Sequence, residues 1–522
     1  MCTFGEGVEK TDLNNVRLKG QKNNRRIQLA TVFSGIGAIE HALDRMNLPH
    51  KIVFACDNGD VDVLSKKIPE EIIEVEKELS ELTTQIQKIE IQNEEDKLYK
   101  SELDLILSKT NDEIRNYKQM NLYNSTENKI SRKLKDICQR TAMLHEKINS
   151  FKILKELSKI SDFREKKWFV DNLYKSKENS NKVKQTYMAN YNVSEDDFHW
   201  NVSFLDGKQY ENQVDLFVGG SPCQSFSLVG KQRGLADTRG TLFYEYARLV
   251  KEIRPKVFIY ENVKALLSND EGRTWETVQK IFTDLNYSWK YKVLNAKDYG
   301  IPQNRERVFV VGFRNDLKLK KTFEFPQPIK LERKMQDFLL DNAPGGYFLP
   351  KKGVDFVTAE KNLTKKYTQI DGEIQLCQKK NQQFNWHGDF VFQSEEDASK
   401  KIKTDLEKYF LSDKVRKYVL ATGTKGFYSR PKIDLEVARP LLTTMHKMHR
   451  AGVDNYVTTD GRLRKLTPRE CFRLMGFYDD FIIPVSDTSA YQQAGNSIVV
   501  DVLIHIMNSI LESYPNLAEG NK

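Results

Sequence analysis

The chain contains neither glycine nor proline from residue 70 to residue 206, a span far too long for an ordinary loop. Apolar residues recur within it at alternating steps of three and four, over 72–89 and again over 130–151. That spacing is typical of helices that pack along a heptad seam. The polar stretch 121–128 indicates a turn, so we predict two long helices forming an antiparallel hairpin within an insertion at 70–185. We expect a spacer or subunit interface, with a grip on nucleic acid as the alternative.

Apolar segments typical of buried strands lie on both sides of this helical stretch. Residues 27–33 lead into a glycine turn with Gly35 and Gly37, after which come a helical pattern and a second strand, 51–56. This second strand ends at Asp57, where a carboxylate commonly binds a ribose hydroxyl. Strand, glycine turn, helix, strand and acidic residue, in this order, open a nucleotide-binding α/β unit.

The α/β pattern resumes after the helical stretch. Strand-like segments occupy 214–220, 257–263 and 307–313, and an irregular stretch of aromatic, basic and turn residues follows them. We predict a second domain in that irregular stretch. The divisions we expect are a polar N-terminal tail (1–26), a first catalytic part (27–69), the helical insertion (70–185), a second catalytic part (186–315), the second domain (316–460) and a C-terminal catalytic part (461–522).

Two groups of polar residues follow predicted strands. Cys223 comes after Pro222 in a polar, glycine-rich loop, at the end of a strand, where α/β proteins place their sites. Glu261 and Asn262 end the next predicted strand. Burial there could raise the pKa of the Glu261 carboxyl enough for it to donate a proton, although a helix cap would also explain this residue.

Two arginines, Arg305 and Arg307, lie two residues apart at the entry to the strand 307–313. Side chains alternate along a strand, so both should point to the same face. They could bind a carbonyl or a phosphate through paired hydrogen bonds, or they could form a structural salt bridge.

Cysteine usage and charge limit the kind of protein further. The six cysteines are scattered singly, so we expect a reducing compartment, no disulfide framework and no metal. We recognise neither a signal peptide nor a run of about 20 apolar residues that could span a membrane. The formal net charge of +9 fits a polyanionic partner without identifying it. We expect a prokaryotic cytoplasmic protein, associated with the nucleoid and not with a membrane.

Taken in order, these motifs resemble those of the cytosine-5 DNA methyltransferases. They are FSGIG at the glycine turn, the Pro-Cys loop, the Glu-Asn-Val strand and QNRER before the last strand. RKLTPRECFRLMGFYDDF (464–481) and YQQAGNSIVVDV (491–502) are similar to the family's last two blocks. The matching blocks are 27–66, 186–313 and 460–515, about half of the chain.

The resemblance implies a doubly wound α/β sheet that binds S-adenosylmethionine, a small target-recognition domain, and double-stranded DNA between them. Asn201 stands where the family usually has an acid for the adenine amino group, and Ala38 where many members have a further glycine. The cofactor-binding residues that it implies are Phe33, Gly35, Gly37, Asp57, Asn201, Pro222 and Asn496.

The catalytic residues that the resemblance implies are Cys223, Glu261, Asn262, Arg305 and Arg307. The Cys223 thiolate would add to carbon 6 of cytosine, Glu261 would protonate or hydrogen-bond ring nitrogen 3, and Arg305 would hold the exocyclic oxygen. Because the ring is not reachable inside a duplex, the base must be flipped out, and we expect the loop 224–237 to close around it.

Two other functions stay open at this point. A transfer-RNA cytosine-5 methyltransferase would share the catalytic motifs, but the long stretch between Arg314 and Asp460 suits a reader of duplex DNA. A DNA-binding protein without catalysis would have no need of Cys223 beside an acid. The chain shows no histone-reader or zinc module, which is typical of restriction–modification methylases, so a cognate restriction endonuclease is the expected protein partner.

Overall fold

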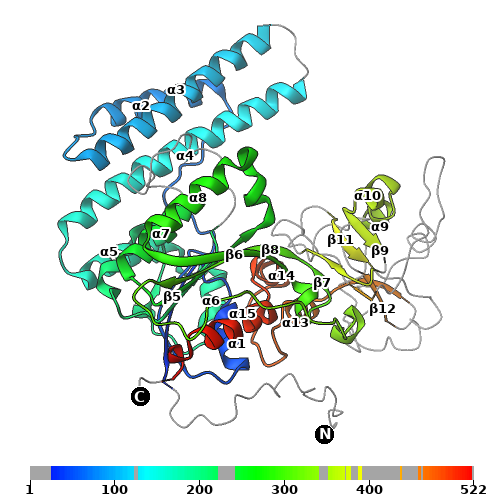
Figure 1. Cartoon of the computed structure of the whole chain (residues 1–522). Coiled ribbons are helices and arrows are strands. Elements are labelled where there is room, and N and C mark those ends of the chain that lie inside the picture. The colour runs from blue at the N-terminus through cyan, green and yellow to red at the C-terminus, as the bar shows by residue number, and fades with distance from the viewer. Residues whose placement is uncertain are drawn as a thin grey trace.

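The protein is represented by a computed structural model that describes residues 25–122, 127–221, 242–339, 351–370, 372–377, 386–390, 436–437, 456–459 and 462–519. At its centre lies a seven-stranded sheet with the order β3-β2-β1-β4-β5-β8-β6 (Figure 1). The strands from β3 to β5 run parallel, and β8 runs antiparallel to β5 and β6. Their bounds are β1 Ile27–Val32, β2 His50–Cys56, β3 Phe198–His199, β4 Leu216–Gly219, β5 Val257–Val263, β6 Tyr287–Asn295 and β8 Glu306–Arg314.

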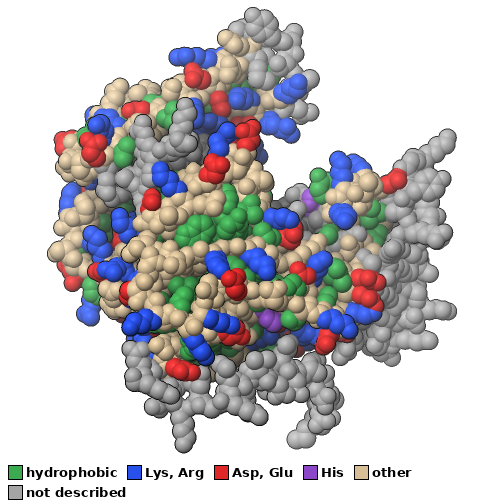
Figure 2. Space-filling view, viewed as in Figure 1, with side chains coloured by type: hydrophobic (Ala, Val, Ile, Leu, Met, Phe, Trp, Pro, Cys, Tyr) green, Lys and Arg blue, Asp and Glu red, His purple; other side chains and the backbone are tan. Residues whose placement is uncertain are grey.

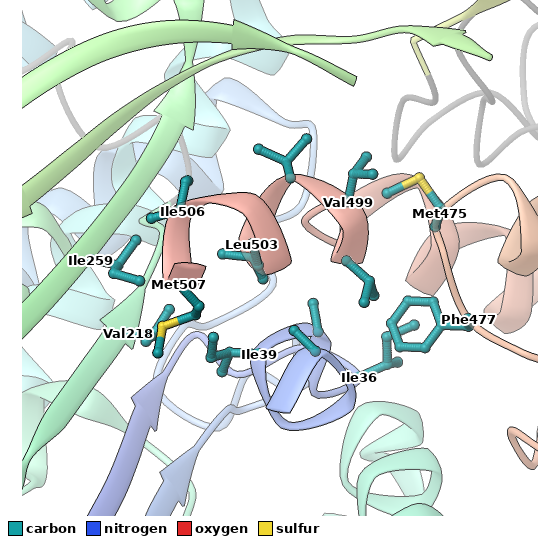
Figure 3. Packing of buried hydrophobic residues seen from close by; sticks show 14 of the residues in the cluster. Ile36, Ile39, Val218, Ile259, Met475, Phe477, Val499, Leu503, Ile506 and Met507 are labelled. Atoms are coloured by element: carbon teal, nitrogen blue, oxygen red, sulfur yellow. The ribbon is translucent and has the colours of Figure 1, made fainter. Parts of the chain in front are cut away.

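Helices cover both faces of this sheet, because successive residues of its central strands are apolar and point in opposite directions. Val218 and Ile259 belong to one core with α1 (Ala38–Arg45) and α15 (Val500–Ser513) (Figure 3). Their neighbours Phe217 and Phe258 belong to a second core with α7 (Leu242–Ile253) and α8 (Arg273–Asp284). The fold is therefore the doubly wound α/β sheet that the sequence predicts. Strand β6 was not predicted.

The helical insertion contains three long helices where two were predicted. They are α2 (Ile72–Gln87), α3 (Glu94–Leu122) and α4 (Glu127–Lys159), which together form an arm above the sheet (Figure 1). Leucine, isoleucine and tyrosine side chains from all three helices form a core of their own. The prediction of two helices was wrong because α3 carries its buried residues, such as Leu103 and Ile114, in a strongly charged background.

The arm joins the sheet through a small apolar cluster at its base. Leu64, before the arm, and Leu157, near its end, both belong to this cluster. The chain then continues through α5 (Phe163–Tyr174) and α6 (Lys182–Asn190) toward β3. Tyr174 of α5 stacks on Trp200 with ring centroids 4.9 Å apart. The end of the insertion is therefore packed against the α/β fold beside β3.

The predicted second domain is described only in short segments, which lie to one side of the sheet (Figure 1). Three two-stranded sheets involve it, and the pair β7–β10 joins it to the catalytic part. The bounds are β7 Gln303–Asn304, α9 Lys351–Val357, α10 Glu360–Thr364, β9 Thr368–Ile370, β10 Gln375–Leu376, β11 Gly388–Phe390, β12 Tyr456–Thr459 and β13 Arg462–Lys465.

The C-terminal segment returns to the sheet as α13 (Pro468–Arg473), α14 (Asp487–Asn496) and α15. By length and composition, one stretch of the described chain, Asp487–Ser513, which comprises α14 and α15, is apolar enough to cross a membrane. In the fold, 67% of its apolar window is buried. A core helix that packs against a sheet has this composition for that reason.

A buried ion pair connects the first helix of the sheet to the last. Arg45 of α1 donates to both carboxylate oxygens of Asp501 at 2.7 and 3.0 Å, and both side chains are less than a tenth exposed. Arg45 also donates to the carbonyl of Gly476 at 2.8 Å. This pair holds together segments that lie 456 residues apart in the sequence.

We expect Asp501→Ala to lower the free energy of unfolding by about 3–5 kcal/mol, because the Arg45 charge stays buried without its partner. Chemical denaturation measures this change. Glu512→Ala is the matched control on the same helix, since Glu512 pairs with Lys321 and both are more than half exposed; its cost should stay below about 1 kcal/mol. Equal effects of the two substitutions would contradict the expectation.

Candidate active site

The glycine turn connects the end of β1 to α1 in a left-handed backbone conformation. Phe33, Gly35 and Gly37 have φ values of 52°, 55° and 82°. A side chain at Gly37 would collide with the Tyr191 ring, 2.1 Å from an added Cβ, whereas at Gly35 the first atom met is the Phe33 carbonyl oxygen at 3.9 Å. The turn is therefore packed against Tyr191 on one side and open beside Gly35. Phe33 is a non-glycine residue in a costly conformation, as is common at ligand sites.

Asp57 follows β2 and lies beside this turn, because β1 and β2 are parallel neighbours. Its carboxylate accepts hydrogen bonds from the backbone N–H groups of Gly35 and Gly59, each at 2.8 Å. Asn181, immediately before α6, donates to the Asp57 carbonyl at 2.9 Å. The insertion thus helps to hold the backbone beside the glycine turn, a contribution that no sequence pattern indicates.

Asn201 and Asn496 lie in different surroundings. The Asn201 amide donates to the Tyr174 hydroxyl at 2.9 Å and accepts from the Ser203 N–H at 2.9 Å. It also lines a cavity between α5 and the chain after β3. Asn496 is the exposed last residue of α14.

Glu261 lies near the end of β5, next to the chain that leads from β4 toward the Pro-Cys loop. A Cβ added at Gly220 would stand 2.8 Å from a Glu261 carboxylate oxygen, so only glycine fits at this position. The Glu261 side chain is 13% exposed. The carboxyl group therefore faces the backbone three residues before Cys223.

Asn262 points to the opposite side of β5 and holds the same chain. Its amide nitrogen donates to the Ser221 carbonyl at 2.8 Å and to the Tyr260 hydroxyl at 2.7 Å. The Ser221 hydroxyl, in turn, hydrogen-bonds to that of Tyr260 at 2.7 Å. All three side chains are buried. Asn262 therefore fixes the backbone two residues before Cys223. Pro222, Cys223 and the loop 224–237 lie outside the described residues.

The two arginines converge on a third side chain that the sequence did not single out. Arg307 pairs with Glu261, Nε to Oε1 at 3.1 Å. Arg305 is buried and donates to the carbonyls of Gly495 at 3.0 Å and Ser497 at 2.8 Å. Both guanidinium groups also donate to the Cys377 sulfur, Arg305 at 3.4 Å and Arg307 at 3.2 Å. A single cysteine in an irregular stretch carries no sequence signal for such a role.

Burial dominates the electrostatics of this cluster. Removal from water raises the pKa of the Glu261 carboxyl above its ordinary value, and the charges of Arg307 and Arg305 oppose the shift without cancelling it. Burial, followed by the charge of Arg307, lowers the pKa of Arg305 to about 10. Glu261 can therefore hold a proton at a pH where an exposed glutamate has lost it, which is what a general acid requires.

A model of the family described as C-5 cytosine-specific DNA methylase matches residues 162–512. The chain belongs to this family of enzymes. It is therefore a DNA cytosine-5 methyltransferase, and its methyl donor is S-adenosylmethionine. Within the described residues, no group of three or more His, Cys, Asp or Glu side chains is placed to hold a metal ion.

Curated relatives agree with this assignment. The chain is 34% identical over 334 residues to the Type II methyltransferase M.SsoII of Shigella sonnei, covering 63% of this chain and 72% of that one. It is 35% identical over 298 residues to the Type II methyltransferase M.HhaI of Haemophilus parahaemolyticus, covering 57% and 75%. It is 29% identical over 398 residues to the orphan methyltransferase M.SPRI of Bacillus phage SPR, covering 64% and 90%.

The residues around the glycine turn fit S-adenosylmethionine. The open side of Gly35 allows close approach of a ligand, and the Asp57 carboxylate stands at the end of the neighbouring strand, where a ribose hydroxyl can be bound. Gly37 differs from the expectation in one respect: its missing side chain makes room for Tyr191, whose hydroxyl donates to the Gly37 carbonyl at 2.6 Å.

We expect Glu261→Gln to lower kcat for methyl transfer on the order of 10²- to 10⁴-fold, because the variant has no proton to donate. The protonated form of Glu261 is lost as the pH rises through its raised pKa. The kcat of the wild type should therefore fall as the pH rises, and this fall should occur above the ordinary glutamate pKa of about 4.3. The pH profile of the variant should lack this alkaline limb. The pH dependence of kcat measures both, and an identical limb in the variant would contradict the assignment.

Proposed function

We propose that the enzyme methylates carbon 5 of a cytosine flipped out of duplex DNA, with Cys223 as the nucleophile and Glu261 as the general acid. The observation that carries this proposal is the buried Glu261 carboxyl, which has a raised pKa and lies against the chain that leads to Cys223. An acid in this place can act on the ring that the thiolate attacks.

The proposed mechanism assigns one task to each residue. The Cys223 thiolate adds to carbon 6 of the ring and breaks the double bond between carbons 5 and 6. The electrons shift through carbon 4 to ring nitrogen 3, and Glu261 delivers its proton there. Arg307 orients the Glu261 carboxyl, and Asn262 holds the backbone that carries Cys223. S-adenosylmethionine supplies the methyl group for carbon 5. Loss of the carbon 5 proton, release of Cys223 and return of the nitrogen 3 proton to the Glu261 carboxylate then restore the ring and the enzyme.

Arg305 has a different place in this arrangement. The resemblance implies that it holds the exocyclic oxygen of cytosine, but its Nη2 donates to the Gly495 and Ser497 carbonyls. We propose that Arg305 mainly joins the C-terminal segment to the active site. Its guanidinium also contributes positive charge beside the ring, and this charge favours the negative charge that develops on attack.

We propose that residues 316–460 read the target sequence and that the enzyme acts on nucleoid DNA in the cytoplasm of a prokaryote, as part of a restriction–modification system. Support for the system comes from the names of M.SsoII and M.HhaI as Type II methyltransferases. A cognate restriction endonuclease would then be a partner. The orphan methyltransferase among the relatives represents the alternative, an enzyme without one.

Transfer of labelled methyl groups tests the activity and its substrate. We expect label to enter duplex DNA as 5-methylcytosine and not transfer RNA, and we expect Cys223→Ser to abolish the transfer, because a serine hydroxyl is far less nucleophilic than a thiolate. Cys138→Ser is the control, since Cys138 is buried in the arm. Label in transfer RNA alone would support the RNA enzyme, and transfer by the Cys223→Ser variant would exclude this nucleophile.

We propose that the arm formed by α2, α3 and α4 is a spacer or interface and not part of the catalytic site. Several of its basic residues are paired within the arm, for example Arg140 with Glu113 at 2.7 Å and Lys147 with Glu102 at 2.7 Å. Basic and acidic side chains are interspersed over the face of the arm seen in Figure 2. A surface that binds phosphates would instead present an excess of positive charge.

Replacing residues 66–150 by a short glycine–serine linker should leave methyl transfer measurable. The linker can close because Asn149 donates to the Leu64 carbonyl at 2.8 Å, so the two ends of the arm lie close together. The matched comparison is Asn181→Ala, which should weaken cofactor binding because Asn181 holds the Asp57 backbone. Complete loss of activity in a folded linker variant would show that the arm takes part in catalysis.

A further inference from the structure

Cys377 connects the proposed recognition region to the catalytic arginines. It follows β10, which pairs with β7 in parallel register, Gln375 opposite Gln303 and Leu376 opposite Asn304. This register brings Cys377 next to Arg305. Its sulfur then accepts hydrogen bonds from Arg305 Nη1 at 3.4 Å and Arg307 Nη2 at 3.2 Å.

The segment that carries Cys377 is held by the rest of the recognition region. The Leu376 N–H donates to the carboxylate of buried Asp389 at 2.9 Å. Asp389 belongs to β11, which pairs with β9. Contacts therefore run continuously from this small sheet through residue 376 to Cys377, then to Arg307, and finally to Glu261 across the 3.1 Å ion pair.

The chemistry of the contact suits a positioning role. Two guanidinium groups that approach one another repel, and a polarizable sulfur between them gives both a shared acceptor. A thiol is only a weak acceptor, so the contact adds little to stability. It does restrict the directions of two long side chains that would otherwise sample several rotamers. Arg307 can orient the Glu261 carboxyl only if its own direction is fixed.

We propose that Cys377 is a positioning residue for cytosine methylation: it fixes Arg305 and Arg307, and through Arg307 it orients the Glu261 carboxyl. The catalytic cluster is then complete only while the segment 372–377 is docked on β7. The recognition region thereby supports the chemical step as well as DNA binding. This inference rests on the general-acid role proposed for Glu261.

Two substitutions separate the acceptor from the volume of the side chain. Cys377→Val keeps an apolar side chain of similar size and removes the acceptor, whereas Cys377→Ser keeps an acceptor. We expect the valine variant to lose about tenfold in kcat, because a less fixed Arg307 orients the Glu261 carboxyl less well, with the KM for DNA unchanged. Its alkaline limb should move to higher pH, because a loosely held Arg307 stabilises the Glu261 carboxylate less. The serine variant should retain most of the activity and the wild-type limb.

Glu373→Ala is the matched control, since Glu373 is exposed in the same segment; its kcat and pH profile should equal those of the wild type. An unchanged kcat and limb in Cys377→Val would overturn the proposal. Equal losses in the valine and serine variants, or failure of both to fold, would also overturn it by making the contact purely structural.

A double-mutant cycle distinguishes this inference from the function on which it rests. In a Glu261→Gln background, Cys377→Val should cause little further loss of kcat, because both changes act on the same carboxyl. If Glu261→Gln alone leaves kcat and the limb unchanged, the general-acid role is wrong. If Glu261→Gln has its expected effect and the two losses multiply independently, only the positioning role of Cys377 is wrong.

Discussion

The arrangement of side chains around the end of β5 depends on burial of the Glu261 carboxyl. A carboxyl withdrawn from water must be protonated or paired, and the fold provides for both. Gly220 leaves space for it, Arg307 pairs with it, and the remaining desolvation raises its pKa. The antiparallel strand β8 is what makes this possible, because the register of β8 on β5 sets Arg307 opposite Val263, diagonally across from Glu261.

The residues that surround Glu261 and the two arginines come from different parts of the chain. The C-terminal segment supplies the carbonyls that hold Arg305, and the same segment is fixed to α1 by the Arg45–Asp501 ion pair. Because α1 begins at the glycine turn, the cofactor site and the catalytic cluster share one rigid support. This arrangement suits a reaction in which the methyl donor and the target ring must meet within narrow limits of distance and angle.

Much of the sheet could be predicted from the sequence, because β1, β2, β4, β5 and β8 are largely apolar runs. Of the candidate site residues, the structure brings Glu261, Arg305 and Arg307 together, as their positions at neighbouring strands indicate. Strand β6 was missed since lysines alternate with its aromatic residues, as suits a half-exposed edge strand. The roles of Cys377, Tyr191 and Asn181 could not be predicted. Each of them acts through contacts with residues distant in sequence, which no local pattern encodes.

The segment between Asp57 and β3 divides physically into two parts, which explains how it can be so long. The arm has its own apolar core and starts and ends at one small cluster, so its length has little effect on the geometry of its ends. The part that returns to the sheet is different, since Asn181 and Tyr191 contact Asp57 and Gly37. We therefore expect changes of length to be tolerated in the arm, whereas the path back to the sheet is fixed by its contacts with Asp57 and the glycine turn.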